Sequence, residues 1–260
     1  MLWEGSNNME KKTFLNGEKH MLVSMVQADN PDRIKELIDL SFREGADALG
    51  MQFCKLKQEY RNTETYKELF AKASPLPVYV TNYRKHGSNK AKTDEMLAKE
   101  LLELAECGAT LCDVMGDYFD VCEGELTMNE SAVEKQMKLI DELHAKGAQV
   151  LMSSHVHKFI SLEQALKIAH EHQQRGADIC KIVTRASDMA EQIENMRIID
   201  VLKKELKIPF ILLCGGECSI LRRVGGAIGN CMSLCVSEHD AFSTPSQPLL
   251  RDVKIIKKLI

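Results

Sequence analysis

Two apolar stretches decide the fold of this chain: QVLMSSH at residues 149–155 and DICKIVT at residues 178–184. Each stretch follows a helix-like segment and a Gly-Ala step, which begins at Gly147 in one case and at Gly176 in the other. Continuous apolar runs of this kind are typical of parallel strands that are covered on both faces. Glycine at the helix-to-strand joint accepts the left-handed conformation that ends many helices. The two stretches therefore predict one repeated helix–strand unit.

The same alternation extends over most of the 260 residues. Eight such units in one chain predict a single closed (β/α)8 TIM barrel over residues 20–260, with residues 1–19 as an N-terminal arm. Strands are expected at about 21–26, 46–53, 77–82, 109–115, 148–154, 178–183, 209–214 and 231–236. Helices are expected at about 31–44, 62–73, 92–107, 129–146, 161–175, 187–206, 218–227 and 247–259.

The composition is ordinary for a soluble globular protein, with 44% hydrophobic and 28% charged residues. No apolar run approaches the roughly 18 residues that a membrane-spanning helix needs. The net charge of -4 lacks the basic character of a nucleic-acid-binding domain. The first residues, MLWEGSNNME, do not have the pattern of a signal peptide. We therefore expect a cytoplasmic protein that binds neither nucleic acid nor membrane.

The nine cysteines favour reduced thiols over a disulfide framework, because their number is odd and several lie within the apolar runs. Cys214 and Cys218 are spaced like a metal-binding pair, and so are Cys231 and Cys235. Structural zinc sites usually show tighter, matched pairs. The sequence therefore favours structural thiols and predicts no metal at these cysteines.

A lysine inside one predicted strand and a histidine at the end of the strand before it are the strongest candidates for chemistry. Lys181 has apolar neighbours on both sides, and a charged lysine in such a place is costly unless it is paired or neutral. A neutral lysine is a nucleophile toward carbonyl groups, and the imidazole of His155 could move its protons. The pair therefore indicates Schiff-base chemistry, with Lys181 and His155 as catalytic residues.

Other candidates follow from the geometry of a barrel, because its active site lies where the strands end. Arg222 follows the seventh predicted strand, and its guanidinium suits a substrate carboxylate. The adjacent Arg223 leaves open which of the two arginines faces the site. Ser243 and Gln247 follow the eighth strand, and Ser24 lies in the first. We expect Arg222, Ser243, Gln247 and Ser24 to bind substrate.

Histidine pairs raise the alternative of a metal site. His155 and His157 are two residues apart at a strand end, so a metal-dependent barrel hydrolase remains an alternative. A second pair, His170 and His172, lies in a predicted helix and does not share a face, so we expect it to be solvated. The chain lacks a clear cluster of carboxylates at the strand ends that would complete a metal site.

The ordered set of motifs resembles the type I 3-dehydroquinate dehydratases over roughly residues 20–259. The resemblance depends on SSH at 153–155, KIV at 181–183, ILRRVGG at 220–226 and STPSQ at 243–247, with LVS at 22–24 also similar. It implies that Lys181 forms an imine with the substrate ketone and that His155 shuttles protons. It further implies that Arg222 holds the substrate carboxylate while Ser243 and Gln247 close a lid. Members of the family need no metal or organic cofactor, so none is expected here.

The first half of the chain departs from the family pattern. The second strand usually carries Glu-x-Arg, and here it reads GMQ at 50–52. The third usually ends in arginine before a Lys-Glu-Gly-Gly-like turn, and here it reads TNYRKHG at 81–87, with Arg84 as a displaced arginine and no turn glutamate. The fourth usually ends in Asp-x-Glu, and here it reads DVMG at 113–116.

These departures imply a redrawn pocket, because the missing groups normally bind substrate hydroxyls and polarise the histidine or the lysine. Gly50 and Gly116 stand for the lost glutamates and are expected to make room. The main prediction is dehydration of 3-dehydroquinate to 3-dehydroshikimate, with the hypothesis that the substrate differs or that this activity is weak. Alternatives are a related imine-forming lyase or aldolase acting on another hydroxylated keto acid, and a non-catalytic small-molecule-binding homologue. Analogy with the family also suggests a homodimer.

Overall fold

The computed structural model describes residues 12–15, 17 and 19–259 of the chain. Most of the predicted N-terminal arm therefore lies outside the described residues. A described part of it is anchored: Phe14 is buried inside the barrel, and its backbone N–H donates to Gln149 Oε1 over 2.8 Å. No helix in the described ranges is long and apolar enough to cross a membrane.

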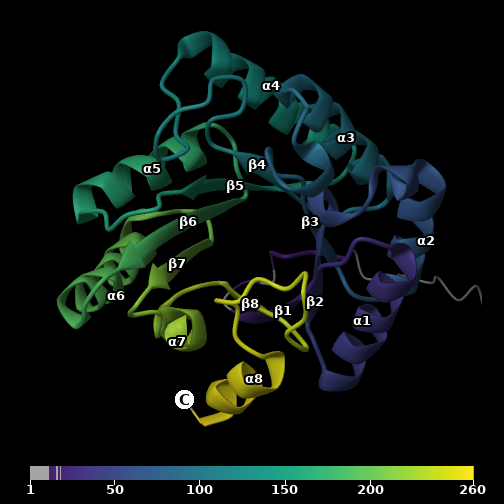
Figure 1. Cartoon of the computed structure of the whole chain (residues 1–260). Helices are drawn as coiled ribbons and strands as arrows, with labels where there is room; N and C mark the ends of the chain where they lie inside the picture. Colours follow the sequence, from purple (N-terminus) through teal and green to yellow (C-terminus); the bar gives the residue numbers. More distant parts are fainter. Residues whose placement is uncertain (1–11, 16, 18, 260) are drawn as a thin grey trace, which may run out of the picture.

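In the described part of the chain, eight parallel strands form one sheet in the order β7-β6-β5-β4-β3-β2-β1-β8. The sheet curls into a nearly closed barrel with the helices outside it (Figure 1), which confirms the predicted (β/α)8 fold. The strands are β1 (Met21–Val26), β2 (Ala48–Gln52), β3 (Val78–Thr81), β4 (Leu111–Met115), β5 (Gln149–His155), β6 (Ile179–Ala186), β7 (Phe210–Gly216) and β8 (Met232–Cys235).

Among the residues that the structure describes, eight α-helices alternate with the strands and cover the outer face of the barrel (Figure 1). They are α1 (Pro31–Glu44), α2 (Thr63–Ala73), α3 (Asp94–Cys107), α4 (Glu130–Ala145), α5 (Leu162–Gln174), α6 (Met189–Glu205), α7 (Leu221–Ile228) and α8 (Leu250–Leu259). Short 3-10 turns, Phe53–Lys55, Gln58–Tyr60 and Gly87–Asn89, lie in the loops after β2 and β3.

The predicted helix boundaries have visible physical causes. Asn30 accepts a hydrogen bond from the Arg33 N–H ahead of a first-turn proline in α1. Ser161 and Gln164 form a capping box at the start of α5. Gly45 ends α1 in the left-handed conformation at φ 76°, as the Gly-Ala pattern predicts.

A side chain helps to close the barrel between β7 and β8, the two ends of the strand order. The Cys231 N–H donates to the Phe210 carbonyl over 2.9 Å. The amide of buried Asn230 then acts like a strand residue: its Oδ1 accepts from the Leu212 N–H at 2.9 Å, and its Nδ2 donates to the Leu212 carbonyl at 3.1 Å. Asn230 thus satisfies backbone groups that a longer β8 would otherwise pair.

Alternate strand residues fill the barrel interior, and the others pack under the helices. On β6, Ile179 belongs to the interior cluster, whereas Cys180 and Ile182 pack against the helical layer. This alternation directs Lys181 into the barrel interior. The apolar interior forms a floor beneath the carboxyl ends of the strands, where polar groups collect.

Candidate active site

Lys181 lies in the barrel interior with only 4% of its surface exposed. Its ammonium donates to Asp113 Oδ2 at 3.1 Å and to the Tyr79 hydroxyl at 3.2 Å, and it also contacts the Tyr83 hydroxyl closely. The lysine comes from β6, the aspartate from β4, and the tyrosines from β3 and the loop after it. Of the two ways in which the sequence allows a buried lysine, paired or neutral, the structure shows the paired one.

Asp113 collects several hydrogen-bond donors. Tyr83 donates to its Oδ2 over 2.6 Å, Tyr79 donates to the same oxygen, and Ser153 donates to Oδ1 over 2.5 Å. Burial by itself would raise the pKa of this carboxyl, but the Lys181 charge and these donors outweigh burial and hold the pKa of Asp113 below its ordinary value. Asp113 is therefore a carboxylate that faces an ammonium.

His155 ends β5 and is oriented by a carboxylate from the β4–α4 loop. Its Nδ1 lies 2.6 Å from Glu125 Oε2, and its backbone N–H donates to the same oxygen over 3.0 Å. Burial would raise the pKa of Glu125, but the bonds and charge of His155 lower it below the ordinary value. A carboxylate on Nδ1 favours the Nδ1–H tautomer and leaves Nε2 available as a base. The ring of Tyr83 lies edge-on to the imidazole at 5.1 Å between centroids.

A cavity of about 140 Å³ brings the predicted catalytic pair together. Lys181 and His155 both line it, and so do Arg222 and Gln247. The remaining lining residues are Met25, Gln52, Tyr79, Thr81, Tyr83, Val183, Leu213, Leu234 and Thr244. Four of the six predicted site residues therefore converge on one small cavity at the carboxyl ends of the strands.

Arg222 is the arginine that borders the cavity, whereas Arg223 is exposed and lines a different hollow next to His20. The Arg222 Nε donates to the Cys214 carbonyl over 3.0 Å, which fixes the guanidinium beside β7. No carboxylate among the described residues forms an ion pair with it, and burial lowers its pKa. Such an unpaired, half-buried cation suits a substrate carboxylate.

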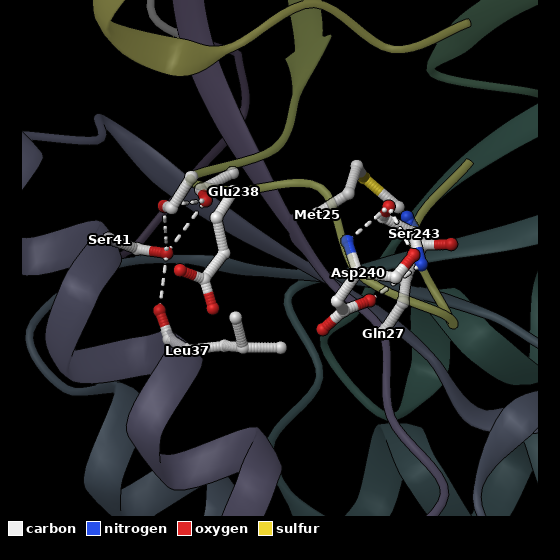
Figure 2. A pocket seen from close by; sticks show the side chains of 9 residues that line it. Met25, Gln27, Leu37, Ser41, Glu238, Asp240 and Ser243 are labelled. Carbon is white, nitrogen blue, oxygen red and sulfur yellow. Dashed lines mark hydrogen bonds between the residues drawn. The ribbon is translucent and has the colours of Figure 1, made fainter. Parts of the chain in front are cut away.

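The loop after β8 places Gln247 at the cavity but turns Ser243 away from it. Gln247 Oε1 accepts from Gln27 Nε2 over 2.8 Å. Ser243 Oγ accepts from the Asp240 N–H at 2.9 Å and donates to the Asp240 carbonyl at 3.0 Å, and Figure 2 shows it turned toward Asp240. The structure therefore does not bring Ser243 to Lys181; the neighbouring Thr244 lines the cavity instead.

Ser24 is also placed away from the lysine cavity. Its hydroxyl lies 2.6 Å from that of Ser41 on α1 and 3.0 Å from that of Ser237, in a buried serine cluster whose member Ser41 is seen in Figure 2. The reason is the alternation of β1, because Met25 faces the barrel interior and the residue before it faces a helix. The structure corrects the expectation that Ser24 faces the substrate.

The two glycines in the divergent half do not make room. A Cβ on Gly50 would lie 2.2 Å from the sulfur of Met25, so the methionine fills the space above β2. A Cβ on Gly116 would lie 2.5 Å from the Glu125 carbonyl oxygen. Gly116 therefore permits the close approach of the loop that carries the partner of His155, and it does not enlarge the pocket.

Arg84 does not replace a substrate-binding arginine in this cavity. Its guanidinium binds Asp94 at 2.8 Å and Asp117 at 2.6 Å, and only 11% of its side chain is exposed. It lines a separate hollow of about 430 Å³ on the far side of His155. Because two carboxylates already pair with its guanidinium, Arg84 is not free to bind substrate. It instead links the loop after β3 to the loop after β4.

The two histidine pairs were the basis of the alternative of a metal site. Within the described part of the chain, no group of three His, Cys, Asp or Glu side chains is arranged to hold a metal. His157 is exposed and lines the larger hollow. His172 was expected to be solvated, and this is wrong: it is fully buried between α5 and the sheet, 3.0 Å from Ser154 Oγ and 3.3 Å from Cys180 Sγ.

All nine cysteines lie in described parts of the chain and are free, as the sequence predicts. Burial raises the pKa of several of these thiols, among them Cys54 and Cys235, the latter to about 12. Such thiols stay protonated and act as small apolar side chains.

Sequence reasoning missed four groups of the site: Asp113, Glu125, Tyr79 and Tyr83. Asp113 was noted only as part of the DVMG stretch that departs from the family pattern. Glu125 lies in a turn-rich loop and belongs to no motif in the sequence. In the structure its φ of 49° is unusual for a residue other than glycine. Tyr79 had one sequence signal, since a tyrosine hydroxyl inside an apolar strand needs a partner. Tyr83 follows β3, within the TNYRKHG stretch that departs from the family pattern, where only the adjacent Arg84 was considered from the sequence.

A model of the type I 3-dehydroquinase family matches residues 22–260 of the chain. The chloroplastic bifunctional 3-dehydroquinate dehydratase/shikimate dehydrogenase of Arabidopsis thaliana is 28% identical over 236 residues, which cover 90% of this chain and 36% of that protein. A 3-dehydroquinate dehydratase of Clostridium kluyveri is 28% identical over 144 residues, which cover 54% of this chain and 55% of the relative. The matched parts thus span about a third to a half of these curated relatives.

Solved structures agree on the fold. The 3-dehydroquinate dehydratase of Geobacillus kaustophilus superposes with a TM-score of 0.81 at 16% identity, covering 96% of this chain and 95% of that one. The type I enzyme of Clostridium difficile, solved with covalently modified comenic acid, gives 0.77 at 15% identity and covers 93% and 92%. Together with the match of the family model over almost the whole chain, these findings show that the chain belongs to the type I 3-dehydroquinase family.

Proposed function

We propose that this protein dehydrates 3-dehydroquinate to 3-dehydroshikimate through an imine on Lys181. The observation that carries this proposal is a lysine almost fully buried in the barrel interior that lines one small cavity with His155. The family match and the names of the relatives support the choice of substrate. We also propose, as finer points, a cytoplasmic location and a homodimer; light scattering on the purified protein tests the homodimer.

In the proposed reaction each residue has one task. Lys181 attacks the ketone, and the resulting iminium acidifies the neighbouring C–H bond. Nε2 of His155 removes that proton and then protonates the departing hydroxyl, while Glu125 holds the ring. Arg222 binds the substrate carboxylate and Gln247 supports it, with Ser243 joining them if the loop after β8 closes on substrate.

Borohydride trapping tests this proposal. Wild-type protein is mixed with 3-dehydroquinate and sodium borohydride, and the digested protein is analysed by mass spectrometry. We expect a reduced adduct on the peptide that contains Lys181 and none in Lys181→Met, while Lys158→Met, an exposed lysine near the site, keeps the adduct.

Turnover provides the second measurement. Formation of the enone product is followed by its ultraviolet absorbance at saturating 3-dehydroquinate. Absence of both an adduct and turnover in folded wild-type protein would overturn the proposed function. An adduct without turnover would instead point to another hydroxylated keto acid as the substrate, because the imine would form and the elimination would not.

A further inference from the structure

Tyr83 joins the two side chains that the proposed reaction needs. Its hydroxyl contacts the Lys181 ammonium and donates to Asp113 over 2.6 Å. Its ring lies edge-on to His155 at 5.1 Å. The residue borders the cavity, and it is half-buried, whereas Asp113 beneath it has no exposed side-chain surface.

The Tyr83 hydroxyl accepts a hydrogen bond from Lys181 and donates one to Asp113. Burial, and then the Asp113 carboxylate, raise the pKa of Tyr83 well above its ordinary range, so the phenol is neutral. A neutral hydroxyl with an acid on one side and a base on the other passes a proton along without becoming charged itself. The contacts Lys181–Tyr83–Asp113 have this form.

Imine formation has a specific proton requirement. A lysine ammonium carries three protons, an iminium nitrogen keeps one, and the other two must leave with the ketone oxygen as water. Direct transfer from nitrogen to oxygen on the same carbon requires a strained four-membered arrangement. A hydroxyl beside the nitrogen that accepts and donates removes this difficulty.

We propose that Tyr83 is a further catalytic residue, whose hydroxyl carries protons between Lys181, Asp113 and the substrate oxygen during imine formation. This inference rests on the proposed function and deepens it. It adds Tyr83 to the proton transfers of imine formation, beside the proton transfers proposed for His155.

The steps balance without another reactant. First, one ammonium proton moves to the Tyr83 oxygen while the Tyr83 proton moves to Asp113, which leaves a neutral amine and a neutral acid. The amine then bonds to the carbonyl carbon, the C=O π electrons move to oxygen, and one N–H proton reaches that oxygen through Tyr83. Finally Asp113 returns its proton through Tyr83 to the hydroxyl, water leaves, and the nitrogen lone pair forms C=N. The iminium then faces the Asp113 carboxylate.

Tyr79 is a matched control for this proposal. Its hydroxyl also contacts Lys181 and donates to Asp113, so Tyr79→Phe removes the same kind of group from the same cluster. Tyr79 is fully buried within β3, whereas Tyr83 is half-buried and lies against His155. A loss that comes only from weaker support of Asp113 would therefore affect both variants equally.

The experiment measures the rate of imine formation in a single turnover of 3-dehydroquinate, quenched with borohydride at successive times. We expect Tyr83→Phe to slow adduct formation by about 100-fold, in the range of general acid–base effects, and Tyr79→Phe to slow it less than about tenfold. Circular dichroism and thermal unfolding establish that both variants are folded. A proton inventory of the wild-type step in H2O–D2O mixtures should curve, because two protons move together in the relay.

The outcomes separate the relay from the function itself. Equal adduct rates in wild-type and Tyr83→Phe protein, equal losses in the two variants, or a linear proton inventory would overturn the relay and leave the proposed function standing. If Tyr83→Phe does not fold, the inventory on wild-type protein decides. Failure of wild-type protein to form any adduct would overturn the proposed function, and the relay with it.

Discussion

Lys181 and Asp113 form a buried ion pair, and the hydroxyls of Tyr79, Tyr83 and Ser153 stabilise its carboxylate by hydrogen bonds. Breaking such a pair by removing one partner typically costs about 3–5 kcal/mol, because a lone charge is left in the interior. The pair also favours the formation of a neutral amine, since a proton transfer that neutralises both partners removes the free-energy cost of two buried charges. The cluster therefore holds the Lys181 ammonium beside a carboxylate and a hydroxyl that can take up its proton.

Glu125 is expected to matter for turnover but not for imine formation. Glu125→Gln removes the charge beside His155 Nδ1 and offers the ring an amide that can hold the wrong tautomer. We expect kcat to fall by about 100-fold or more, the range of a lost general acid–base contribution, while the borohydride adduct on Lys181 still forms. Steady-state turnover and adduct formation, measured side by side, check this.

The control for this variant is Glu123→Gln. Glu123 is exposed, lies in the same loop as Glu125 and pairs at 2.6 Å with Lys158 of the β5–α5 loop. Its substitution should leave turnover within about twofold of wild type, since exposed ion pairs contribute little. Equal losses in the two variants would show that the loop as a whole matters and that the Glu125–His155 contact has no special role.

At the scale of the elements, the phase of each strand decides which residues reach the cavity. The sequence placed Lys181 correctly because apolar neighbours on both sides marked a buried strand. It placed Ser24 wrongly, since β1 is buried on both faces and its sequence contains no polar-apolar alternation to reveal the phase. Glu125 and Tyr83 were missed for another reason: both lie in loops, whose contacts are set by the folded barrel and not by local pattern.

Lys55, in the turn after β2, holds the loop after β8 to the neighbouring part of the barrel. Its ammonium donates to Gln27 Oε1 over 2.7 Å and contacts the Phe242 carbonyl. Lys55→Met keeps the length of the side chain but removes these donors, each bond to a charged group being worth about 1.5–3 kcal/mol. We expect KM for 3-dehydroquinate to rise about tenfold with a smaller change in kcat, as measured by steady-state kinetics.

Hydrogen exchange of residues 236–249 gives the structural readout for Lys55→Met. Exchange there should quicken because the loop loses an anchor. Lys57→Met is the matched control, since Lys57 is exposed and pairs with Asp29 at 2.9 Å. Unchanged exchange in this loop, together with unchanged KM, would show that Lys55 does not hold it in place.

At the scale of the whole molecule, the fold was predictable because one unit is repeated eight times. Each repetition supplied the same signals, an apolar run, an amphipathic stretch and often a glycine joint, so an error in one boundary did not alter the architecture. The junction between β7 and β8 was not predictable from the sequence. It depends on the side-chain amide of Asn230, which bonds the backbone N–H and carbonyl of Leu212 where a longer β8 would have done so. The burial of His172 was equally unpredictable, since it depends on how α5 packs against the sheet.

That burial couples the stability of the protein to pH. Desolvation, and then the charge of Arg175, lower the pKa of His172 from 6.5 to about 3. Between these values the unfolded chain binds a proton that the folded chain does not bind, so stability falls as the pH decreases. The slope is about 1.4 kcal/mol per pH unit for this one group. Stability from His172 is complete above about pH 6.5 and declines steadily below it.

Urea unfolding between pH 7 and pH 4.5 measures this coupling. We expect His172→Asn to flatten the decline by about 2–3 kcal/mol over the range from pH 6.5 to pH 4.5, even if the variant is less stable at pH 7. His239→Asn, at an exposed position, should leave the slope unchanged. His20, whose pKa burial and Lys257 lower to about 4, adds to the remaining slope in both variants. An unaltered slope in His172→Asn would mean that the folded protein admits a proton at this site, and that α5 opens from the sheet before the barrel unfolds.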